Sequence, residues 1–558
     1  MKTYRSNFEP GTTRWAIRKA QWRALGISDE DMLKPKVAVI NSSSDLSICF
    51  SHLDAVAQEV KQAIRQAGGL PFEIKTTAPS DFITCAGRGG RYLMPARDLL
   101  VNDIEVSVEG AQLDGMVCLS SCDKTAPAHL MAAARLNIPT LLVIGGYQAC
   151  GGLQGHRVDI EDVFESVGKL ATGGLSVQAL SDLCEVAVQS PGVCAGMGTA
   201  NTMHILTEAI GMALPGSAPV AARSDRLNIQ ARLSGQRIVA MIEEGLTPCS
   251  IMTPAAFDNA LTVGLAMSGS INMLRHLQAV ATEGGIQFDV YQRLAELDGK
   301  VPLLCAIKPN GAHHIEDLDA AGGARALMKR LEPLLHTEVL TVTGRTLGDH
   351  LAGYKPLSHA CLGTLDRPAG PGPSVIILKG SLAPGGAIMK LGQGDKASRF
   401  EGRCRIFESQ EDALDALSNG ELATGGVIVL RGLGARGGPG VASASWFVAA
   451  INGASLGNEI AIITDGQLSG LNRGFTIGQV MPEAAEGGPI ALLRDGDTVC
   501  IDVAGRRVDL LLDQAELSRR RQALAPFVAR EKKGWLRLYQ DNVQPLSRGG
   551  TLGSDIGT

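Results

Sequence analysis

Three cysteines share one kind of sequence context, and thiols in that context are suited to binding metal. Cys49 lies in DLSICFSHL, Cys122 in SSCDKTAPAHL and Cys194 in PGVCAGMGTANTM, each in a loop just before a predicted helix. The free N–H groups and positive dipole end of a helix N-terminus favour the thiolate. Three converging thiolates could hold an iron–sulfur cluster. Since more than seventy residues separate neighbouring members of the set, spacing alone also fits three unrelated loop thiols.

Carboxylates near these loops could bind a hard cation. Asp123 and Lys124 directly follow Cys122, and Asp81 lies in the loop APSDFITCAGRGG. Carboxylate oxygens are ligands that Mg²⁺ prefers. The alternative for each aspartate is a solvated charge or a helix cap, and the alternative for the lysine is an ordinary ion pair.

A serine follows a predicted strand in the second half of the chain. Ser469 lies in TDGQLSGLNRG, directly after the strand predicted at 460–464. Glycines on both sides would expose its hydroxyl group and let a ligand come close. A plain Ser-Gly turn fits the same pattern.

A glycine-rich loop has the outline of a dinucleotide-binding fingerprint. Gly432, Gly434 and Gly437 spell GxGxxG after a predicted strand. However, Gly438 and Pro439 crowd the point where a helix should begin, and the strand does not open a βαβ unit. The match is therefore poor, although it leaves a nucleotide-dependent oxidoreductase as a rival interpretation.

The elements that must position these loops predict an α/β fold with a mainly parallel sheet for the first two thirds of the chain. Strands alternate with helices in this region, which favours helices on both faces of a parallel sheet. Ser51 and Asp54 resemble a capping box at the start of the first of these helices. The predicted strands are 36–40, 115–119 and 141–144, and the predicted helices are 51–67 and 127–136.

The segment 366–373 (DRPAGPGP) predicts a linker, because proline and glycine dominate it. We expect an N-terminal domain over 1–365 and a C-terminal domain over 375–558. Short β-rich runs beyond the linker predict a β-barrel-like C-terminal domain with flanking helices. These runs are 375–378, 425–430, 460–464, 498–503 and 507–512.

Composition excludes several classes of function. The 558 residues carry a formal net charge of −5 with both signs interspersed, so no basic block predicts nucleic-acid or membrane binding. The polar segment 1–15 lacks the apolar core of a secretory signal, and no apolar run reaches the roughly 18 residues of a membrane span. We therefore expect a cytoplasmic protein, in which most of the twelve cysteines are reduced and buried.

Taken together, the motifs resemble the dihydroxy-acid and sugar-acid dehydratase family over nearly the whole chain. They include NSSSD, AGGLPFE, SCDKTAPAHLMAAARL, CAGMGTANTM, IKPNGAHHIEDLDAAGG, LKGSLAPGGAIMK, LRGLGARGGPG, TDGQLSG and PEAAEGGPIALLRDGD. The resemblance also accounts for the GxGxxG pattern, since GLGARGGPG is similar to a family loop.

The resemblance implies a role for each candidate residue. Cys49, Cys122 and Cys194 match the cluster-binding cysteines of the family, whose cluster is [2Fe–2S] or, in some relatives, [4Fe–4S]. By the same matching, Asp81 and Asp123 are Mg²⁺ ligands, Lys124 is a lysine carbamylated into a further oxygen ligand, and Ser469 is the proposed base.

Two positions depart from the family pattern. The family's Mg²⁺ site uses a glutamate shortly after the GGPG turn, and that position here is Ser443. A water, the Ser443 hydroxyl or another metal arrangement would have to replace the missing carboxylate. Arg88 replaces part of an acidic loop of the amino-acid branch, and its cation could meet a substrate carboxylate.

These features predict a hydro-lyase that converts a 2,3-dihydroxy carboxylate, with a sugar acid favoured, into a 2-keto-3-deoxy acid. The alternatives are a dihydroxy-acid dehydratase of branched-chain amino acid biosynthesis and a repurposed, non-catalytic homologue with an altered Mg²⁺ site. A small hydroxy acid is the expected partner. The resemblance also implies a homodimer or a dimer of dimers.

Overall fold

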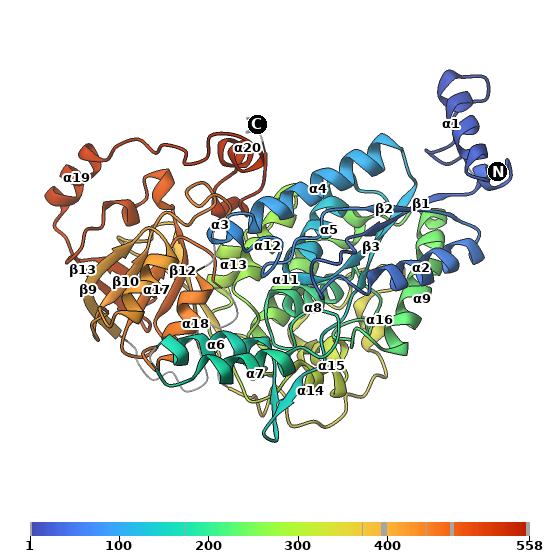
Figure 1. Cartoon of the computed structure of the whole chain (residues 1–558). Helices are drawn as coiled ribbons and strands as arrows, with labels where there is room; N and C mark the ends of the chain where they lie inside the picture. The colour runs from blue at the N-terminus through green and yellow to red at the C-terminus, as the bar shows by residue number, and fades with distance from the viewer. Residues whose placement is uncertain are drawn as a thin grey trace.

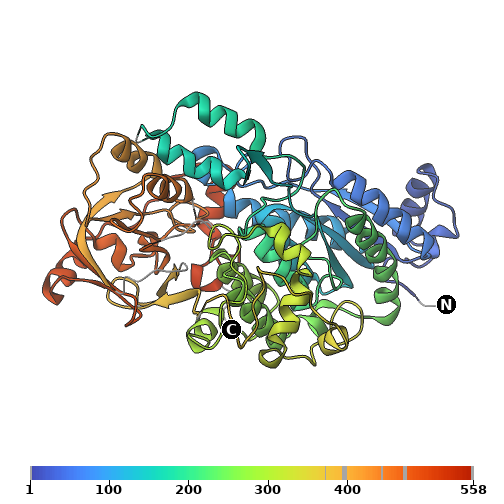
Figure 2. The ribbon, with the colours of Figure 1, turned by 90° about the horizontal axis from the view of Figure 1, so that it is seen from below.

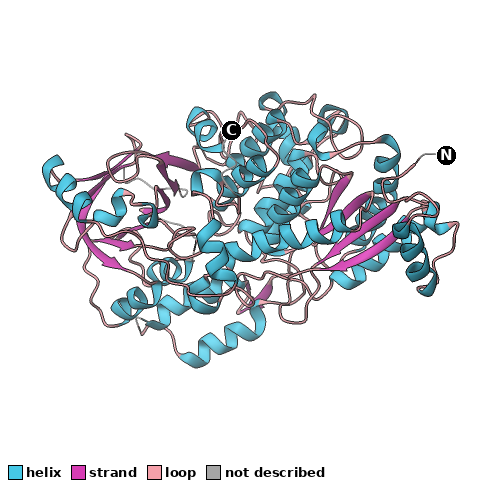
Figure 3. Ribbon diagram, turned by 90° about the horizontal axis from the view of Figure 1, so that it is seen from above, coloured by secondary structure: helices cyan, strands magenta, loops and turns pink. Residues whose placement is uncertain are grey.

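The computed structural model describes residues 3–171, 173–370, 372–391, 399–441, 444–468 and 474–553. An N-terminal domain, blue to yellow in Figure 1, lies beside a C-terminal domain in orange and red, and the view from below shows the same arrangement (Figure 2). Strands gather into sheets at opposite ends of the molecule, with helices between them (Figure 3). Among the described helices, none combines the length and the apolar character that spanning a bilayer requires.

The N-terminal sheet is parallel, as predicted, and has four strands in the order β2–β1–β3–β4. Every residue of β1, β3 and β4 is buried, which fits a parallel sheet covered on both faces. The strands are β1 (Lys36–Asn41), β2 (Leu70–Lys75), β3 (Gly115–Ser120) and β4 (Thr140–Ile144), followed by the small hairpin β5 (Gly151–Leu153) and β6 (His156–Val158).

Helices surround this sheet and fill the rest of the N-terminal domain. The apolar face predicted for the first covering helix is buried in α2, which packs against α9. The helices are α1 (Thr13–Ala24), α2 (Leu53–Gln66), α3 (Gly87–Gly90), α4 (Leu93–Gly110), α5 (Cys122–Leu136), α6 (Ile160–Ala171), α7 (Val177–Ala187), α8 (Thr199–Ile210), α9 (Asp225–Glu244), α10 (Pro248–Ile251), α11 (Pro254–Ala266), α12 (Asn272–Glu283), α13 (Val290–Glu296), α14 (Ile315–Ala320), α15 (Gly323–Leu331) and α16 (Leu347–Leu351).

The predicted capping box at Ser51 is wrong. The residue that precedes α2 is His52, and its side chain makes no cap hydrogen bond. The Ser51 hydroxyl instead donates to the carbonyl oxygen of Ile48 at 3.2 Å. This bond helps to form the turn that contains Cys49, so the sequence before α2 shapes the cysteine loop and not the helix end.

The C-terminal sheet has eight strands in the order β14–β13–β9–β10–β11–β12–β8–β7 and curls into a nearly closed barrel, as predicted. Its edge strands approach each other through the bridge between Lys379 and Arg507. The strands are β7 (Val375–Leu378), β8 (Gly386–Lys390), β9 (Arg399–Phe407), β10 (Val427–Leu430), β11 (Ala461–Thr464), β12 (Thr476–Met481), β13 (Thr498–Asp502) and β14 (Arg507–Leu510), and the helices are α17 (Gln410–Ser418), α18 (Ser445–Gly453), α19 (Gln514–Ala523) and α20 (Trp535–Asn542).

Alternate residues of the C-terminal strands enter different hydrophobic cores. Val427 and Val429 of β10 belong to a core made only of C-terminal residues. Ile428 and Leu430 of the same strand belong to the large core that also includes the N-terminal sheet. Successive side chains of a strand point to opposite faces. One face of β10 therefore fills the interior of the barrel, and the other face packs against the N-terminal domain.

Two further contacts join the domains. Helix α6 packs against α18 so closely that a Cβ atom on Gly168 would lie 2.1 Å from the carbonyl oxygen of Ala450. Near the C-terminus, the buried guanidinium of Arg97 in α4 donates to the carbonyl oxygens of Gly549 and Gly550 at 3.1 and 2.8 Å. The end of the chain is therefore part of the N-terminal domain's packing.

Candidate functional site

The three candidate cysteines come together at the N-termini of α2, α5 and α8. The buried thiols of Cys49 and Cys122 are hydrogen-bonded to each other. The thiol of Cys194 lies close enough for the charge at Cys49 to act on it. Burial and that charge raise the pKa of Cys194 well above its usual value.

Hydrogen bonds between loops hold this convergence in place. The Ser121 hydroxyl donates to the carbonyl oxygen of Cys49 at 2.6 Å, which joins the first cysteine loop to the second. The Asn201 amide of α8 donates to the carbonyl oxygen of Cys194 at 2.7 Å. The backbones of Cys49 and Cys194 are thus held by contacts that do not depend on their own sulfur atoms.

Cys122 has a strained backbone. Its φ of 66° lies in the left-handed region, which residues other than glycine rarely adopt. Such conformations cost of order 1–3 kcal/mol and concentrate at functional sites.

The hydrogen bond between Cys122 and Cys49 makes the two thiols unequal in acidity. The Cys122 thiol donates to Cys49, and this bond lowers the pKa of Cys49. The same bond, together with burial, raises the pKa of Cys122. One thiol of the pair therefore ionises well before the other.

Asp81, Asp123 and Lys124 form a buried charged cluster beside the cysteines. Lys124 Nζ lies 2.9 and 2.7 Å from the two carboxylate oxygens of Asp81. Asp123 is hydrogen-bonded to Asp81 and accepts from the backbone N–H of Ala200 at 3.1 Å. Burial and the charge of Asp81 raise the pKa of Asp123 to about 7. A second positive charge in this cluster would relieve the repulsion between the carboxylates.

Residues of the C-terminal domain complete the wall around the two carboxylates. A cavity of about 30 Å³ is lined by Asp81 and Asp123 together with Ser445, Trp446 and Gln467. Another cavity, of about 40 Å³, extends from Asp123 to Cys194 and Glu161. The candidate site therefore lies at the boundary between the domains.

Gln467 is a site residue that the sequence patterns did not single out. Its amide Nε2 approaches Asp81 Oδ2 at 3.5 Å, and its Oε1 accepts from Arg275 at 3.0 Å. Nearby, the Asn272 amide donates to the carbonyl oxygen of Leu468 at 2.7 Å. The available signal was its position two residues before Ser469 in TDGQLSG.

Two predicted site residues lie outside the part of the chain that the structure describes. These are Ser469 and Ser443. Described residues adjoin both, since Gln467 and Leu468 precede Ser469, and Ala444 and Ser445 follow Ser443. Gln467 contacts Asp81, and Ser445 lines the cavity beside it.

Arg88 lies apart from the carboxylate cluster. Its side chain is 55% exposed and forms an ion pair with Glu531 at 3.1 Å. It lines a cavity of about 320 Å³ that also contains Glu408 and Glu411. Arg91 also lines this cavity, but Arg88 lines neither of the cavities beside Asp81 and Asp123. The structure therefore gives no support to a contact between Arg88 and a substrate held at those carboxylates.

The GxGxxG loop does not present free donors for a nucleotide. The backbone N–H groups of Gly432 and Leu433 donate to the buried carboxylate of Asp465 at 3.2 and 2.9 Å. Those of Arg436 and Gly437 donate to Glu483 at 2.8 and 2.9 Å. Because carboxylates of this chain already occupy the groups that would bind a pyrophosphate, the structure argues against a dinucleotide site here.

The donor atoms of the site fit the two inorganic groups that the sequence implies. The three converging thiols, of which Cys49 and Cys122 are buried and Cys194 is partly buried, are soft ligands suited to an iron–sulfur cluster. Two hydrogen-bonded carboxylates beside a buried lysine are hard oxygen ligands suited to Mg²⁺. Both sets lie within one pocket region, because Asp123 and Cys194 line the same small cavity.

Comparison with known proteins gives one consistent result. Residues 34–350 match the dihydroxy-acid/6-phosphogluconate dehydratase N-terminal model, and residues 360–550 match the corresponding C-terminal model. The dihydroxy-acid dehydratase of Ignicoccus hospitalis is 42% identical over 541 residues, which cover 96% of this chain and 98% of that protein. The dihydroxy-acid dehydratase of Pyrococcus abyssi is 40% identical over 96% of this chain and 97% of its own length. That of Methanothrix thermoacetophila is also 40% identical, over 98% of this chain and 100% of its own length.

Proposed function

Because this chain belongs to the dihydroxy-acid/6-phosphogluconate dehydratase family and is a hydro-lyase, we propose that it removes water from a branched 2,3-dihydroxy carboxylate and leaves the 2-keto acid. Its relatives from Ignicoccus and Pyrococcus are named dihydroxy-acid dehydratases, which supports a dihydroxy acid as the substrate. Such a product suits branched-chain amino acid biosynthesis.

The SCDKTAPA motif resembles the sugar-acid branch of the family, and it is the basis of the preference for a sugar acid. That preference has less support. Relatives that match nearly the full length of the chain at 40–42% identity carry the name dihydroxy-acid dehydratase. A full-length match weighs more than one eight-residue motif, so aldonates become the second substrate class to test.

One observation carries the proposal: the convergence of three thiols beside a cluster of two carboxylates and a lysine. Under this proposal Cys49, Cys122 and Cys194 hold an iron–sulfur cluster, with [2Fe–2S] expected. The Mg²⁺ ligands are Asp81, Asp123 and a carbamate on Lys124. Lys124 Nζ lies against both carboxylate oxygens of Asp81, so a carbamate there would bring its oxygens beside Asp81 and would need Mg²⁺ to offset the negative charges.

The reaction is an elimination across C2 and C3 of the substrate. When bound, the iron–sulfur cluster would supply a Lewis acid for the C3 hydroxyl, and Mg²⁺ would supply one for the carboxylate and the C2 hydroxyl. In our proposal Ser469 accepts the C2 proton, the C2–H electron pair forms the double bond, and the C3 hydroxyl leaves with its C–O electron pair. The enol then tautomerises to the ketone, so the reaction involves no net oxidation or reduction.

The described residues around Ser469 support this role through position. Gln467 bridges Arg275 and Asp81, and Asn272 binds the carbonyl oxygen of Leu468, so the chain entering the serine loop is held against the carboxylates. A serine hydroxyl needs a nearby positive charge to become an effective base. The carboxylate cluster is where that charge is expected.

Anaerobic purification followed by iron, sulfide and Mg²⁺ analysis and a 2-keto acid assay tests the proposal. We expect iron-dependent turnover that is greatest on branched 2,3-dihydroxy acids. Turnover on aldonates alone would replace the substrate assignment. Full activity in iron-free protein would overturn the assignment of the cysteines.

A further inference from the structure

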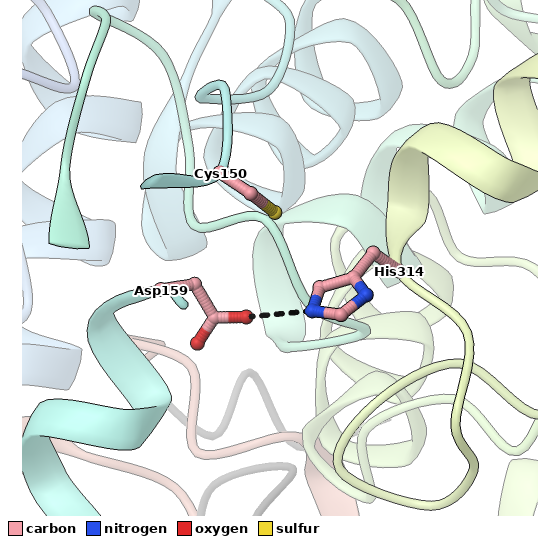
Figure 4. Close-up of side chains that lie close together, drawn as sticks. All are labelled: Cys150, Asp159 and His314. Atoms are coloured by element: carbon pink, nitrogen blue, oxygen red, sulfur yellow. Dashed lines mark ion pairs between the residues drawn. The ribbon is translucent and has the colours of Figure 1, made fainter. Parts of the chain in front are cut away.

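A second group of potential metal ligands lies outside the proposed catalytic residues. Cys150, Asp159 and His314 each offer one ligand atom, and the three atoms lie within 4.8 Å of one another. Figure 4 shows the three side chains directed toward a common point from separate segments. The proposed dehydration reaction uses none of them.

The β5–β6 hairpin brings two of these residues together. Gly151 pairs with Val158 in antiparallel register, so Cys150 and Asp159 flank the hairpin at its base. These residues are nine positions apart in sequence, and only the hairpin makes them neighbours. The third residue, His314, directly precedes α14.

Contacts around the cluster hold α14 against the hairpin. The backbone N–H of Cys150 donates to Glu316 Oε1 at 3.1 Å. On the other strand, Arg157 forms an ion pair with Asp317 at 2.9 Å. The protein thus positions the backbones of all three candidate ligands without a metal ion.

The polar atoms that face the centre of the cluster lack partners. The side chains of His314 and Asp159 are 10% and 2% exposed, and His314 Nε2 lies 3.9 Å from Asp159 Oδ2. Among the described residues, neither atom has a hydrogen-bond partner. Asp159 Oδ1, in contrast, accepts from the N–H of Glu161 at 2.8 Å and lies 3.4 Å from Lys308 Nζ. Unpartnered buried polar atoms are costly, which suggests a missing ligand.

We propose that Cys150, Asp159 and His314 bind a divalent transition-metal ion of the zinc type. A thiolate, an imidazole and a carboxylate form a donor set suited to Zn²⁺ and poorly suited to Mg²⁺. Tetrahedral zinc places such ligand atoms roughly 3.3–3.8 Å apart, so side-chain shifts of about 1 Å complete the site. Cys150 is half-buried, which leaves room for water as the fourth ligand.

Metal binding at this site would fasten the hairpin to the segment before α14. Binding releases the Cys150 proton to solvent and leaves the thiolate on the ion. Asp159 also stands at the start of α6, and Glu161 of that helix lies beside Gly196 in the third cysteine loop. The ion would therefore stabilise a region next to the proposed active site without touching the substrate.

Cobalt(II) titration of cluster-loaded protein tests this proposal. Excess Mg²⁺ is present throughout to fill the carboxylate site. We expect a near-ultraviolet thiolate-to-cobalt band in the difference spectrum, with one Co²⁺ bound per chain and displaced by Zn²⁺. Cys150→Ser should abolish the band, and His314→Ala should weaken Co²⁺ binding by more than about tenfold. His313→Ala and Cys249→Ser are matched controls that should bind like wild type.

Iron content and circular dichroism establish that each variant is folded and loaded. A Co²⁺ band that persists unchanged in Cys150→Ser, or equal Co²⁺ affinity in His314→Ala and His313→Ala, would overturn the proposal. Absence of a band in the wild-type protein would also overturn it. None of these outcomes depends on dehydratase activity, so they leave the proposed reaction to its own test.

Discussion

Lys124 and Asp81 form an ion pair in the interior, with the lysine fully buried and Asp81 8% exposed. Asp123 is hydrogen-bonded to Asp81, so one lysine faces two carboxylates. In a medium of low dielectric constant, this lysine is the main compensation for their repulsion until a metal ion binds. The pair therefore offsets part of the negative charge that the two carboxylates place in the interior.

Replacing Lys124 by methionine should destabilise metal-depleted protein by about 3–5 kcal/mol, because an unpaired buried charge remains. The measurement is the urea midpoint in the presence of a chelator. Lys34→Met breaks the partly exposed pair with Asp31 and should cost at most about 1 kcal/mol. Equal losses in the two variants would contradict this prediction.

Serine substitution at Cys49, Cys122 or Cys194 should lower bound iron by at least about tenfold, because each thiolate is a direct ligand in the proposed cluster. Iron and sulfide analysis after anaerobic purification is the measurement. The exposed Cys184 supplies a matched control, and Cys184→Ser should retain the wild-type iron content. Retention of iron in all three variants would exclude the proposed ligand set.

Ser469→Ala should lower kcat by about 10²–10⁴-fold, the usual contribution of a general base. Iron and Mg²⁺ contents should stay at wild-type levels, because the serine is not a proposed ligand. Ser518→Ala, on the exposed face of α19, should leave kcat unchanged. A kcat for Ser469→Ala within a factor of two of wild type would assign the base to another group.

Ser443→Glu should tighten Mg²⁺ binding by about tenfold, since added anionic ligands increase the affinity of such sites. Activity measured against Mg²⁺ concentration gives the apparent affinity. The control is Ser443→Gln, because glutamine has nearly the same size as glutamate but no charge. This variant should bind Mg²⁺ with the wild-type affinity. An identical response from Glu and Gln would show that the Mg²⁺ site does not lack a carboxylate at this position.

The buried carboxyl group of Glu208 should make stability depend on pH. Burial raises the pKa of Glu208 to about 7, although it accepts from the N–H groups of Gly216 and Ala218 at 2.8 Å each. The folded chain therefore binds this proton more tightly than the unfolded chain. The contribution to stability is complete below about pH 4.5 and is lost as pH rises toward 7, by about 1.4 kcal/mol per pH unit.

Glu208→Gln removes this titration, so wild type should lose roughly 3 kcal/mol relative to the variant between pH 5 and pH 8. Urea unfolding of both proteins across that range measures the difference. Glu185→Gln, at an exposed position of α7, is the matched control and should show a flat difference. A wild-type protein that gains stability relative to Glu208→Gln with rising pH would contradict the sign.

Local patterns predicted the elements that depend on near neighbours. The alternation of strands and helices predicted β1, α2, β3 and β4, and the helix-start context predicted where the cysteine loops lie. The start of α5 was placed too late, at Pro127, although the helix begins at Cys122. Pro127 is the sixth residue of the helix, where proline is normally disfavoured, so the rule that places proline at a helix start was misleading here.

Features made by distant contacts escaped sequence reasoning. Arg88 pairs with Glu531, which lies more than four hundred residues away. Gln467 reaches Asp81 across the domain boundary, and Cys150 meets His314 only after α14 packs on the hairpin. No periodicity or spacing encodes such pairs, because their separation along the chain has no relation to their distance in space.

The small cavity between the domains has a consequence for access. At about 30 Å³ it holds one or two water molecules, whereas ligand pockets usually offer roughly 300 Å³ or more. Among the described residues, Trp446 and Gln467 form part of the wall over Asp81 and Asp123, so a dihydroxy acid needs more space there than this conformation offers. We therefore expect the boundary between the domains to widen when substrate binds.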